Sequence, residues 1–328
     1  MNARLFVAAL AAVALGSCSG SGAARAPAAS ASTASASTSS NTAPSSTSAT
    51  SSTSSTSSTA ATSSTTALTP TKVTKVLVVV VENHSLAQMQ SAMPYTFALA
   101  KRYGYADHYT AIRHPSLPNY LAIASGSTHG VTDDRDPSAH RLHGATVFGT
   151  AVAARRTAGV YADAMSAPCR ATSAGRYAVR HNPWTYFVDE RVACQKYDRP
   201  MGSFTTAVRA GTLPAAGMLV PDLCHDAHDC SLATADAWFR DRMRTITAGP
   251  DWRSGRLVVV LTADEDDRTA GNRVLTVVAH PALSHVVVHT PMTHYSLTRL
   301  YAEVTHTRAL GSGVSAPSMA RAFGLRTS

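Results

Sequence analysis

Two continuous runs of β-branched apolar residues stand out along the chain, and acidic residues follow each of them. Residues 75–81 (KVLVVVV) end at Glu82, and residues 256–262 (RLVVVLT) end just before Asp264. Unbroken apolar runs of this length are typical of strands that are buried on both faces of a parallel sheet. Residues 274–279 and 286–288 provide two further candidate strands.

Helical patterns alternate with these strands. They cover residues 94–103, which end at Gly104, residues 231–247, with Ser231 as a plausible N-cap, and residues 294–304. Strands that alternate with helices predict an α/β domain of three layers, in which helices cover both faces of a mostly parallel central sheet.

The N-terminal part of the chain follows a different pattern. Residues 5–15 form an apolar run after Arg4, and Leu-Gly-Ser-Cys follows, ending at Cys18. This order predicts an export signal with a lipobox, in which Cys18 becomes lipidated; ordinary cleavage near Ser17 is the alternative. The run is too short to span a bilayer, which needs about 20 residues.

Residues 19–69 consist almost entirely of Ser, Thr and Ala. Such a segment cannot bury enough apolar surface to offset the entropy of ordering it, so we expect a disordered linker. The chain therefore divides into a lipoprotein signal peptide (1–18), a linker (19–69) and one folded domain (70–328). We expect an extracellular protein, either lipid-anchored at the cell membrane or secreted.

The charge balance adds little to this picture. The formal net charge of +9 includes Arg4 and Arg25, so the remainder carries +7. A positive field favours anionic substrates. No Lys/Arg run of the kind that marks a nucleic-acid site is present, so we predict no nucleic-acid partner. The oligomeric state is left open.

Four cysteines remain once Cys18 is assigned to the lipid: Cys169, Cys194, Cys224 and Cys230. An even number in an exported chain predicts two disulfides. Three pairings are possible, and proximity in sequence favours 169 with 194 and 224 with 230.

The short segment from Cys224 to Cys230 has an alternative interpretation. His225 and His228 lie inside it, and Cys and His are both zinc ligands. An exported chain and the six-residue gap favour a disulfide that fixes the loop and its histidines.

The acidic residues at the two strand ends predict a metal site. Glu82 and Asn83 follow one strand, and residues 264–267 (DEDD) follow the other. Ligands of such sheets bind beyond the carboxyl ends of the strands, where both clusters fall. Carboxylate and amide oxygens suit a hard divalent cation.

Residues 113–126 carry the candidate nucleophile. Pro118 fits the first turn of a short helix, with Ser116 at or just before its N-terminus. Free N–H groups and the helix dipole attract a phosphate there, so a deprotonated Ser116 could attack phosphorus. Alternatively, Ser116 is only an N-cap.

Six ordered motifs resemble those of a known family. Ser116-Leu117-Pro118-Asn119, with later Ser-Gly and His-Gly pairs, is similar to the nucleophile segment of the alkaline phosphatase superfamily. More closely, the chain resembles the bacterial phosphoesterase family that contains secreted acid phosphatases and phospholipases C. The matching motifs are residues 82–85, 114–120, 181–184, 224–230, 262–267 and 293–297.

This resemblance implies an alkaline phosphatase-like fold, a phosphoesterase catalytic domain and roles for particular residues. One divalent metal ion of unknown identity would be held by Glu82, Asn83, Ser116, Asp264 and Glu265. His181 and His228 would line the phosphate pocket, and His294 matches the last motif. Ala263 departs from the family, in which an aromatic residue is common. Four consecutive acids leave the ligating pair among residues 264–267 open.

Phosphate monoester hydrolysis requires charge stabilisation, an in-line nucleophile and protonation of the leaving group. Ser116 would form a phosphoserine intermediate, and His228 is the first choice to protonate the leaving oxygen. His181 or His114 would contact the phosphoryl group. The resemblance extends to enzymes that act on phosphatidylinositol 3-phosphate, so a lipid or small-molecule phosphate ester is the expected substrate.

Two other functions remain open. A phosphodiesterase of the phospholipase C type would use the same nucleophile and metal. A non-catalytic lipoprotein of the cell envelope would explain the anchor and linker, but not the six motifs. A sulfatase is disfavoured, because Tyr120 stands where that signature requires an arginine.

Overall fold

The computed structural model describes residues 71–328. The expected signal peptide, Cys18 and the linker lie outside the described residues. None of the described helices is both long enough and apolar enough to cross a membrane.

A central eight-stranded sheet organises the described domain. Its strand order is β5-β4-β6-β1-β7-β8-β2-β9. The long central strands are β1 (Lys75–Val81) and β7 (Leu257–Ala263), and both are buried along their length, apart from partly exposed Lys75. The others are β5 (Asp198–Pro200), β4 (Ala158–Ala162), β6 (Ala216–Val220), β8 (Thr276–Ala279), β2 (Gly104–Ala106) and β9 (Val286–Val288).

Strand direction confirms the predicted mostly parallel sheet. β5, β4, β6, β1 and β7 pair parallel with one another. β8 runs against its neighbours β7 and β2, and β9 pairs parallel with β2. A separate parallel pair joins β3 (Tyr109–Thr110) to β10 (Met292–Thr293).

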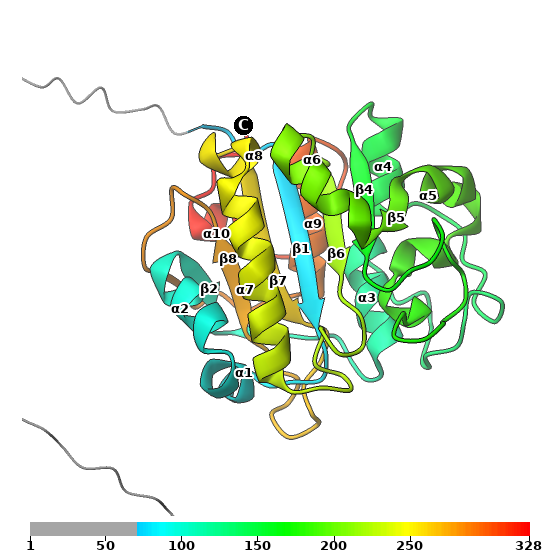
Figure 1. The fold of residues 1–328 in the computed structure, drawn as a ribbon, viewed down its shortest axis with the longest axis horizontal. Helices are drawn as coiled ribbons and strands as arrows, with labels where there is room; N and C mark the ends of the chain where they lie inside the picture. Colours follow the sequence, from blue (N-terminus) through cyan, green and yellow to red (C-terminus); the bar gives the residue numbers. More distant parts are fainter. Residues whose placement is uncertain (1–70) are drawn as a thin grey trace, which may run out of the picture. The chain divides into compact units, whose positions relative to one another are not determined.

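Helices cover both faces of the sheet, which gives three layers (Figure 1). On one face lie α1 (Leu86–Ala92), α2 (Pro94–Arg102), α6 (Phe204–Ala210), α7 (Leu232–Ala248) and α8 (Pro250–Arg253). On the other lie α3 (Ser116–Ser125), α4 (Val147–Ala153), α9 (His294–Thr305) and α10 (Met319–Phe323). α5 (Arg191–Tyr197) packs beside β4 and β5 at one edge. Short 3₁₀ turns complete the chain: η1 (Val179–His181), η2 (Pro183–Tyr186), η3 (Val188–Glu190), η4 (Met201–Ser203) and η5 (Gly311–Val314).

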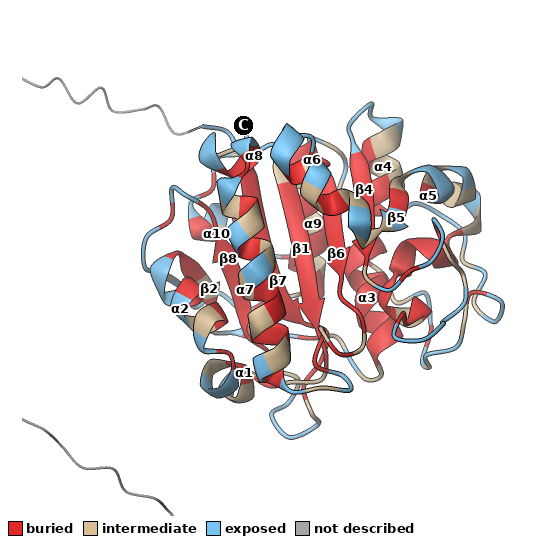
Figure 2. Ribbon diagram, in the orientation of Figure 1, coloured by how far each residue is buried: buried red, intermediate tan, exposed pale blue. Residues whose placement is uncertain are grey.

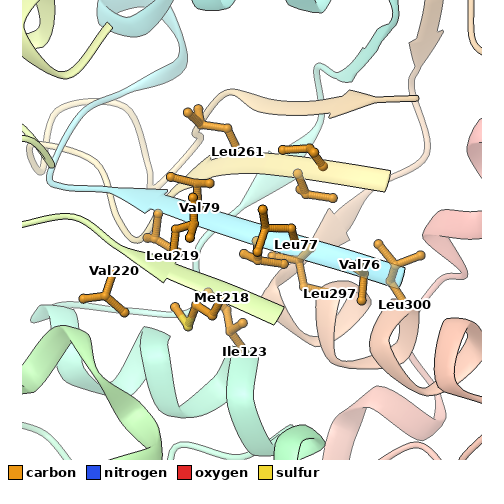
Figure 3. Close-up of a cluster of buried hydrophobic side chains, with 14 of the residues drawn as sticks. Val76, Leu77, Val79, Ile123, Met218, Leu219, Val220, Leu261, Leu297 and Leu300 are labelled. Carbon is orange, nitrogen blue, oxygen red and sulfur yellow. The ribbon is translucent and has the colours of Figure 1, made fainter. Parts of the chain in front are cut away.

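The core lies on both faces of the central strands, against α2 and α7 on one side and against α3 and α9 on the other. Figure 3 shows Leu77 of β1 beside residues of β6 and β7, with Ile123 of α3 and Leu297 of α9 nearby. Burial is continuous along the central strands and along α3 (Figure 2). This packing holds the carboxyl ends of β1 and β7, and the start of α3, in fixed positions.

Helix α3 is buried along its whole length, which is unusual for a helix of ten residues in the outer layer of a sheet. Thr298 of α9 donates a hydrogen bond to the Ala122 carbonyl at 2.6 Å. Gly126 ends the helix with a φ of 72°, and a Cβ atom there would collide with the Leu310 carbonyl. The close approach and the left-handed backbone both require glycine at this point.

Candidate active site

The two acidic clusters lie side by side at one edge of the sheet. β1 and β7 are adjacent and parallel, with Val81 opposite Ala263, so Glu82 and Asp264 leave the sheet together. The backbone N–H of Asn83 donates to Asp264 Oδ1 at 3.1 Å. The structure therefore brings together the residues that the two strand-end patterns had predicted to meet.

Ser116 opens helix α3 directly beside this edge. Its hydroxyl donates to Glu82 Oε2 at 2.8 Å, and the residue is only 3% exposed. The N-cap of α3 is Pro115, so Ser116 is the first helical residue, and the reading of Ser116 as only an N-cap is wrong. Asn119, one turn later, donates to Glu265 Oε2 at 3.1 Å.

The four consecutive acids divide into two pairs. Asp264 and Glu265 face Ser116 and Asn119. The Asp266 carboxylate instead accepts hydrogen bonds from backbone N–H groups of residues 268, 270 and 272. Asp267 accepts from Gln88 and Thr269. The second pair therefore holds the loop, and the first pair is available to a ligand.

The side-chain oxygen atoms at this edge of the sheet suit the coordination of a hard divalent cation. Asn83 Oδ1 and Asp264 Oδ2 are buried and have no hydrogen-bond partner. Burying an acceptor atom without a partner destabilises the folded state, unless a cation or a hydrogen-bond donor binds to it. With Glu82, Glu265 and the Ser116 hydroxyl they form a set of oxygen ligands only, which is the set that Mg²⁺, Ca²⁺ or Mn²⁺ prefers.

The electrostatics of the acids agree with this fit. Burial raises the pKa of Asp264 well above its usual range, and the charges of Glu82 and Glu265 raise it further. Burial, Glu82 and Asp134 raise the pKa of Glu265 to about 8. Several carboxyl groups thus crowd a buried space without enough positive charge, and a divalent cation would offset their repulsion.

His181 lies between two buried carboxylates. Its Nε2 is 3.3 Å from Glu82 Oε2, and its Nδ1 is 3.0 Å from Asp226 Oδ2. Neither nitrogen is aligned for a hydrogen bond, so these contacts are ion pairs. Burial alone would lower the pKa of His181, but the charges of Glu82 and Asp226 raise it to about 9. His181 is therefore an imidazolium next to the candidate nucleophile.

Glu82 is ionised because its surroundings compensate for burial. Burial would raise the pKa of Glu82, but the charge of His181 and the hydroxyl groups of Tyr120 and Ser116 lower it to about 2. Tyr120 donates to Glu82 Oε1 and stacks on the His181 ring, with centroids 5.1 Å apart.

His228 and His114 have different neighbours in the site, His181 for the first and Glu265 for the second. The His228 ring lies 6.1 Å from the His181 ring, centroid to centroid, and its side chain is 32% exposed. His114 Nδ1 lies 3.1 Å from Glu265 Oε1, and its Nε2 lies 3.2 Å from Asp266 Oδ1. Burial and the nearby Arg268 lower the pKa of His114.

His294, the last predicted histidine, is fully buried. Its Nε2 lies 2.6 Å from the Asp264 carbonyl and its Nδ1 lies 3.1 Å from the Tyr109 hydroxyl. Burial lowers its pKa to about 4. Through its contact with the Asp264 carbonyl, His294 therefore supports the backbone of the loop that carries Asp264.

Both disulfides have the pairing that sequence proximity favoured. Cys169 bonds to Cys194, and Cys224 bonds to Cys230. The zinc alternative for the second pair is therefore wrong. Within that loop, His225 stacks on Trp238 and its Nδ1 lies 2.9 Å from Asp163 Oδ2.

The sequence analysis missed Asp226, Tyr120 and Asp134. The first two lie inside motifs that it quoted, so their position was known but not their contacts. Asp134 Oδ1 accepts the Leu117 N–H at 2.9 Å, at the start of α3. No pattern around Asp134 marked it, because the loop that delivers it has no regular structure.

Comparison with known proteins finds one matching family and several similar phosphatases. The model of the Phosphoesterase family matches residues 89–301. A phosphatidylinositol-3-phosphatase of Mycobacterium tuberculosis is 27% identical over 255 residues, which cover 76% of this chain and 82% of that protein. A phosphate-repressible acid phosphatase of Penicillium chrysogenum is 28% identical over 221 residues, 61% of this chain and 51% of its own length.

Among solved structures, a protein in the alkaline phosphatase superfamily from Vibrio parahaemolyticus has a similar fold. The TM-score is 0.54 at 10% sequence identity, over 76% of this chain and 71% of that one. This likeness confirms the predicted fold class.

Proposed function

Because the chain belongs to the Phosphoesterase family and is a phosphoric monoester hydrolase, we propose that Ser116 is its nucleophile and that it requires one divalent metal ion. The metal ligands in this proposal are Glu82, Asn83, Ser116, Asp264 and Glu265. One observation carries it: the Ser116 hydroxyl lies 2.8 Å from a carboxylate oxygen of Glu82, beside the unsatisfied oxygen of Asp264.

The reaction would proceed in two displacements. A bound divalent ion would supply positive charge that favours the Ser116 alkoxide and neutralises a phosphoryl oxygen. Ser116 Oγ attacks phosphorus, the bond to the leaving oxygen breaks, and a phosphoserine results. Water then attacks phosphorus, which releases inorganic phosphate and restores the serine.

The chain's own groups supply the remaining chemistry. His181 carries positive charge next to Glu82 and can donate a hydrogen bond to the phosphoryl group. His114 is the second candidate for that contact. His228, nearer to solvent, is the proposed proton donor to the leaving oxygen.

The substrate and the location are part of the same proposal. Phosphatidylinositol 3-phosphate is a candidate substrate, supported by the name of the mycobacterial relative. The N-terminal motif supports export and lipid anchoring at Cys18. If the anchor is used, Cys18→Ser should move activity from the membrane fraction to the medium.

The central experiment compares Ser116→Ala with Ser125→Ala, a buried serine of the same helix. We expect Ser116→Ala to lower kcat on p-nitrophenyl phosphate by about 10³-fold or more, because the covalent route is lost. Ser125→Ala should keep most activity. Substantial turnover by folded Ser116→Ala protein would exclude this nucleophile.

The metal is tested by dialysis against EDTA, followed by return of single divalent ions. Activity should disappear and return. A bis-ester substrate in the same assay distinguishes this function from a phosphodiesterase, which would prefer the bis-ester.

A further inference from the structure

Arg180 joins the edge of the active site through His228. An Arg180 guanidinium nitrogen lies 3.1 Å from His228 Nε2. On the other side of the ring, His228 Nδ1 lies 2.7 Å from Asp229 Oδ1. The three side chains form a row from Asp229 through His228 to Arg180.

The hydrogen-bonding capacity of these three side chains determines which ring nitrogen of His228 carries the proton. A guanidinium can only donate, so His228 Nε2 must accept and carries no proton in this arrangement. The ring proton is then on Nδ1, where it is donated to Asp229. Asp229 thus orients His228, and His228 in turn holds Arg180.

Arg180 lies at the outer end of a path that starts at the nucleophile. Ser116 contacts Glu82, Glu82 contacts His181, and the His181 ring faces the His228 ring. Ser116, Glu82 and His181 are all buried, at 3%, 0% and 1% exposed, and the path reaches solvent at His228, whose side chain is 32% exposed. A group bound by Arg180 is therefore beyond the phosphoryl group that Ser116 attacks.

Arg180 also has unused binding capacity. It makes no ion pair with any side chain in residues 71–328. A guanidinium has five N–H donors and binds phosphate in a bidentate manner. The fixed charges closer to Ser116 are mainly carboxylates, so a substrate with additional negative charge needs a cation of this kind.

We propose that Arg180 binds a second anionic group, on the leaving-group side of the substrate. The preferred substrates are then phosphate monoesters whose alcohol portion carries another phosphate. This proposal rests on the proposed function and adds a specificity-determining residue to it. When Arg180 turns to the second anion, His228 Nε2 is free to take up a solvent proton and pass it to the leaving oxygen.

The test compares fructose 6-phosphate, fructose 1,6-bisphosphate and p-nitrophenyl phosphate, with the metal-loaded enzyme. Wild type should favour the bisphosphate over the monophosphate by about 10-fold or more in kcat/KM, as expected for one charge-assisted pair. Arg180→Gln should abolish this preference, mainly through KM. Because p-nitrophenyl phosphate carries no second anion, the ratio of kcat/KM for the bisphosphate to kcat/KM for p-nitrophenyl phosphate should fall by about 10-fold or more in this variant.

Two further variants complete the design. Arg180→Lys should retain part of the preference, since the charge remains without the bidentate geometry. Arg176→Gln, an exposed arginine on the same segment, should behave as wild type.

The inference is overturned if active wild type shows no preference for the bisphosphate. It is also overturned if Arg180→Gln slows all three substrates equally, because that indicates a structural role. Absence of any p-nitrophenyl phosphate hydrolysis by wild type would instead refute the proposed function itself.

Discussion

The buried carboxyl groups of this protein differ in how far their surroundings offset the cost of burying a negative charge. Glu82 is fully buried yet surrounded by His181 and two hydroxyl groups, which keep its pKa at about 2. Asp198, at the start of β5, accepts one hydrogen bond from Asn182 at 2.8 Å, and its other oxygen has no partner. Burial raises the pKa of Asp198 to about 8, although Asn182 and Arg191 lower it.

Asp198→Asn should therefore change how stability depends on pH. The folded state holds the Asp198 proton above the ordinary carboxyl pKa of about 4, so this group makes folding less favourable as pH rises toward 8. Relative to wild type, the variant should gain up to about 4 kcal/mol in the free energy of unfolding between about pH 5 and pH 8.

Urea unfolding of both proteins across this pH range measures the difference. A constant difference between variant and wild type would mean that Asp198 is ionised throughout. Asp133→Asn, at a partly exposed carboxyl group whose pKa is lowered by its hydrogen bond with His140, is the control and should show no such gain.

The candidate site residues that directly follow an apolar run could be placed in the fold from the sequence. Glu82 and Asp264 are examples, because parallel strands deliver their ends to one edge. Asp226 and Arg180 could not be placed, because their contacts depend on the paths of irregular loops. Nothing in the local sequence of Arg180 indicates that it reaches His228, 48 residues away.

At the scale of elements, the loop after β6 has a central role. The Asp226 carbonyl accepts the Glu82 N–H at 2.8 Å, and the Asp226 carboxylate contacts His181 and the His228 N–H. The Cys224–Cys230 disulfide closes this loop over a separation of only six residues. The loop thus couples both candidate histidines to the end of β1.

Replacing Cys224 and Cys230 together by serine should affect catalysis more than stability. A closed loop this short stabilises the fold by about 2 kcal/mol in the chain-entropy view. We expect kcat/KM to fall by about 10-fold or more, because His181 and His228 lose a fixed support.

The other disulfide is the matched control. Cys169 and Cys194 are 25 residues apart in sequence, so replacing both should lower the free energy of unfolding by about 3–4 kcal/mol. It should leave kcat/KM of the folded protein nearly unchanged. Chemical unfolding measures the stability of both double variants, and steady-state kinetics measures their kcat/KM. A larger loss of kcat/KM in the Cys169/Cys194 variant than in the Cys224/Cys230 variant would contradict the assigned role of the loop.

The long elements followed from the sequence, and several short ones did not. β1, α7 with its N-cap Ser231 and α9 lie within about a residue of their predicted ends. β4 and β6 were missed, since AGVYA and AGMLV are short and contain glycine, which weakens any strand pattern. They form strands because they pair in the sheet, where β6 lies next to the long strand β1 and β4 pairs with β6.

At the scale of the whole domain, the proposed metal ligands come from segments far apart in sequence. Glu82 follows β1, Ser116 starts α3, and Asp264 follows β7. Only the folded chain brings them together, so an ion that binds there stabilises folding by mass action. At about 100 times its Kd, the gain is about 2.7 kcal/mol, or a rise in Tm of about 5–10 °C.

Calorimetry with and without the activating ion measures this rise independently of activity. Asp264→Asn should abolish the response, because it removes a central ligand. An equal rise in Tm for Asp264→Asn would place the ion elsewhere. Absence of any rise in wild type would contradict the metal site.

The Cys224–Cys230 disulfide beside His228 would also make activity depend on the redox conditions around the protein. In a reducing compartment Cys224 and Cys230 stay as thiols, because cellular reductants keep such pairs open. A newly made chain would then carry its serine without a fixed histidine partner. Its kcat/KM on phosphate esters would stay about 10-fold lower until the disulfide forms in an oxidising space, which the proposed export would provide.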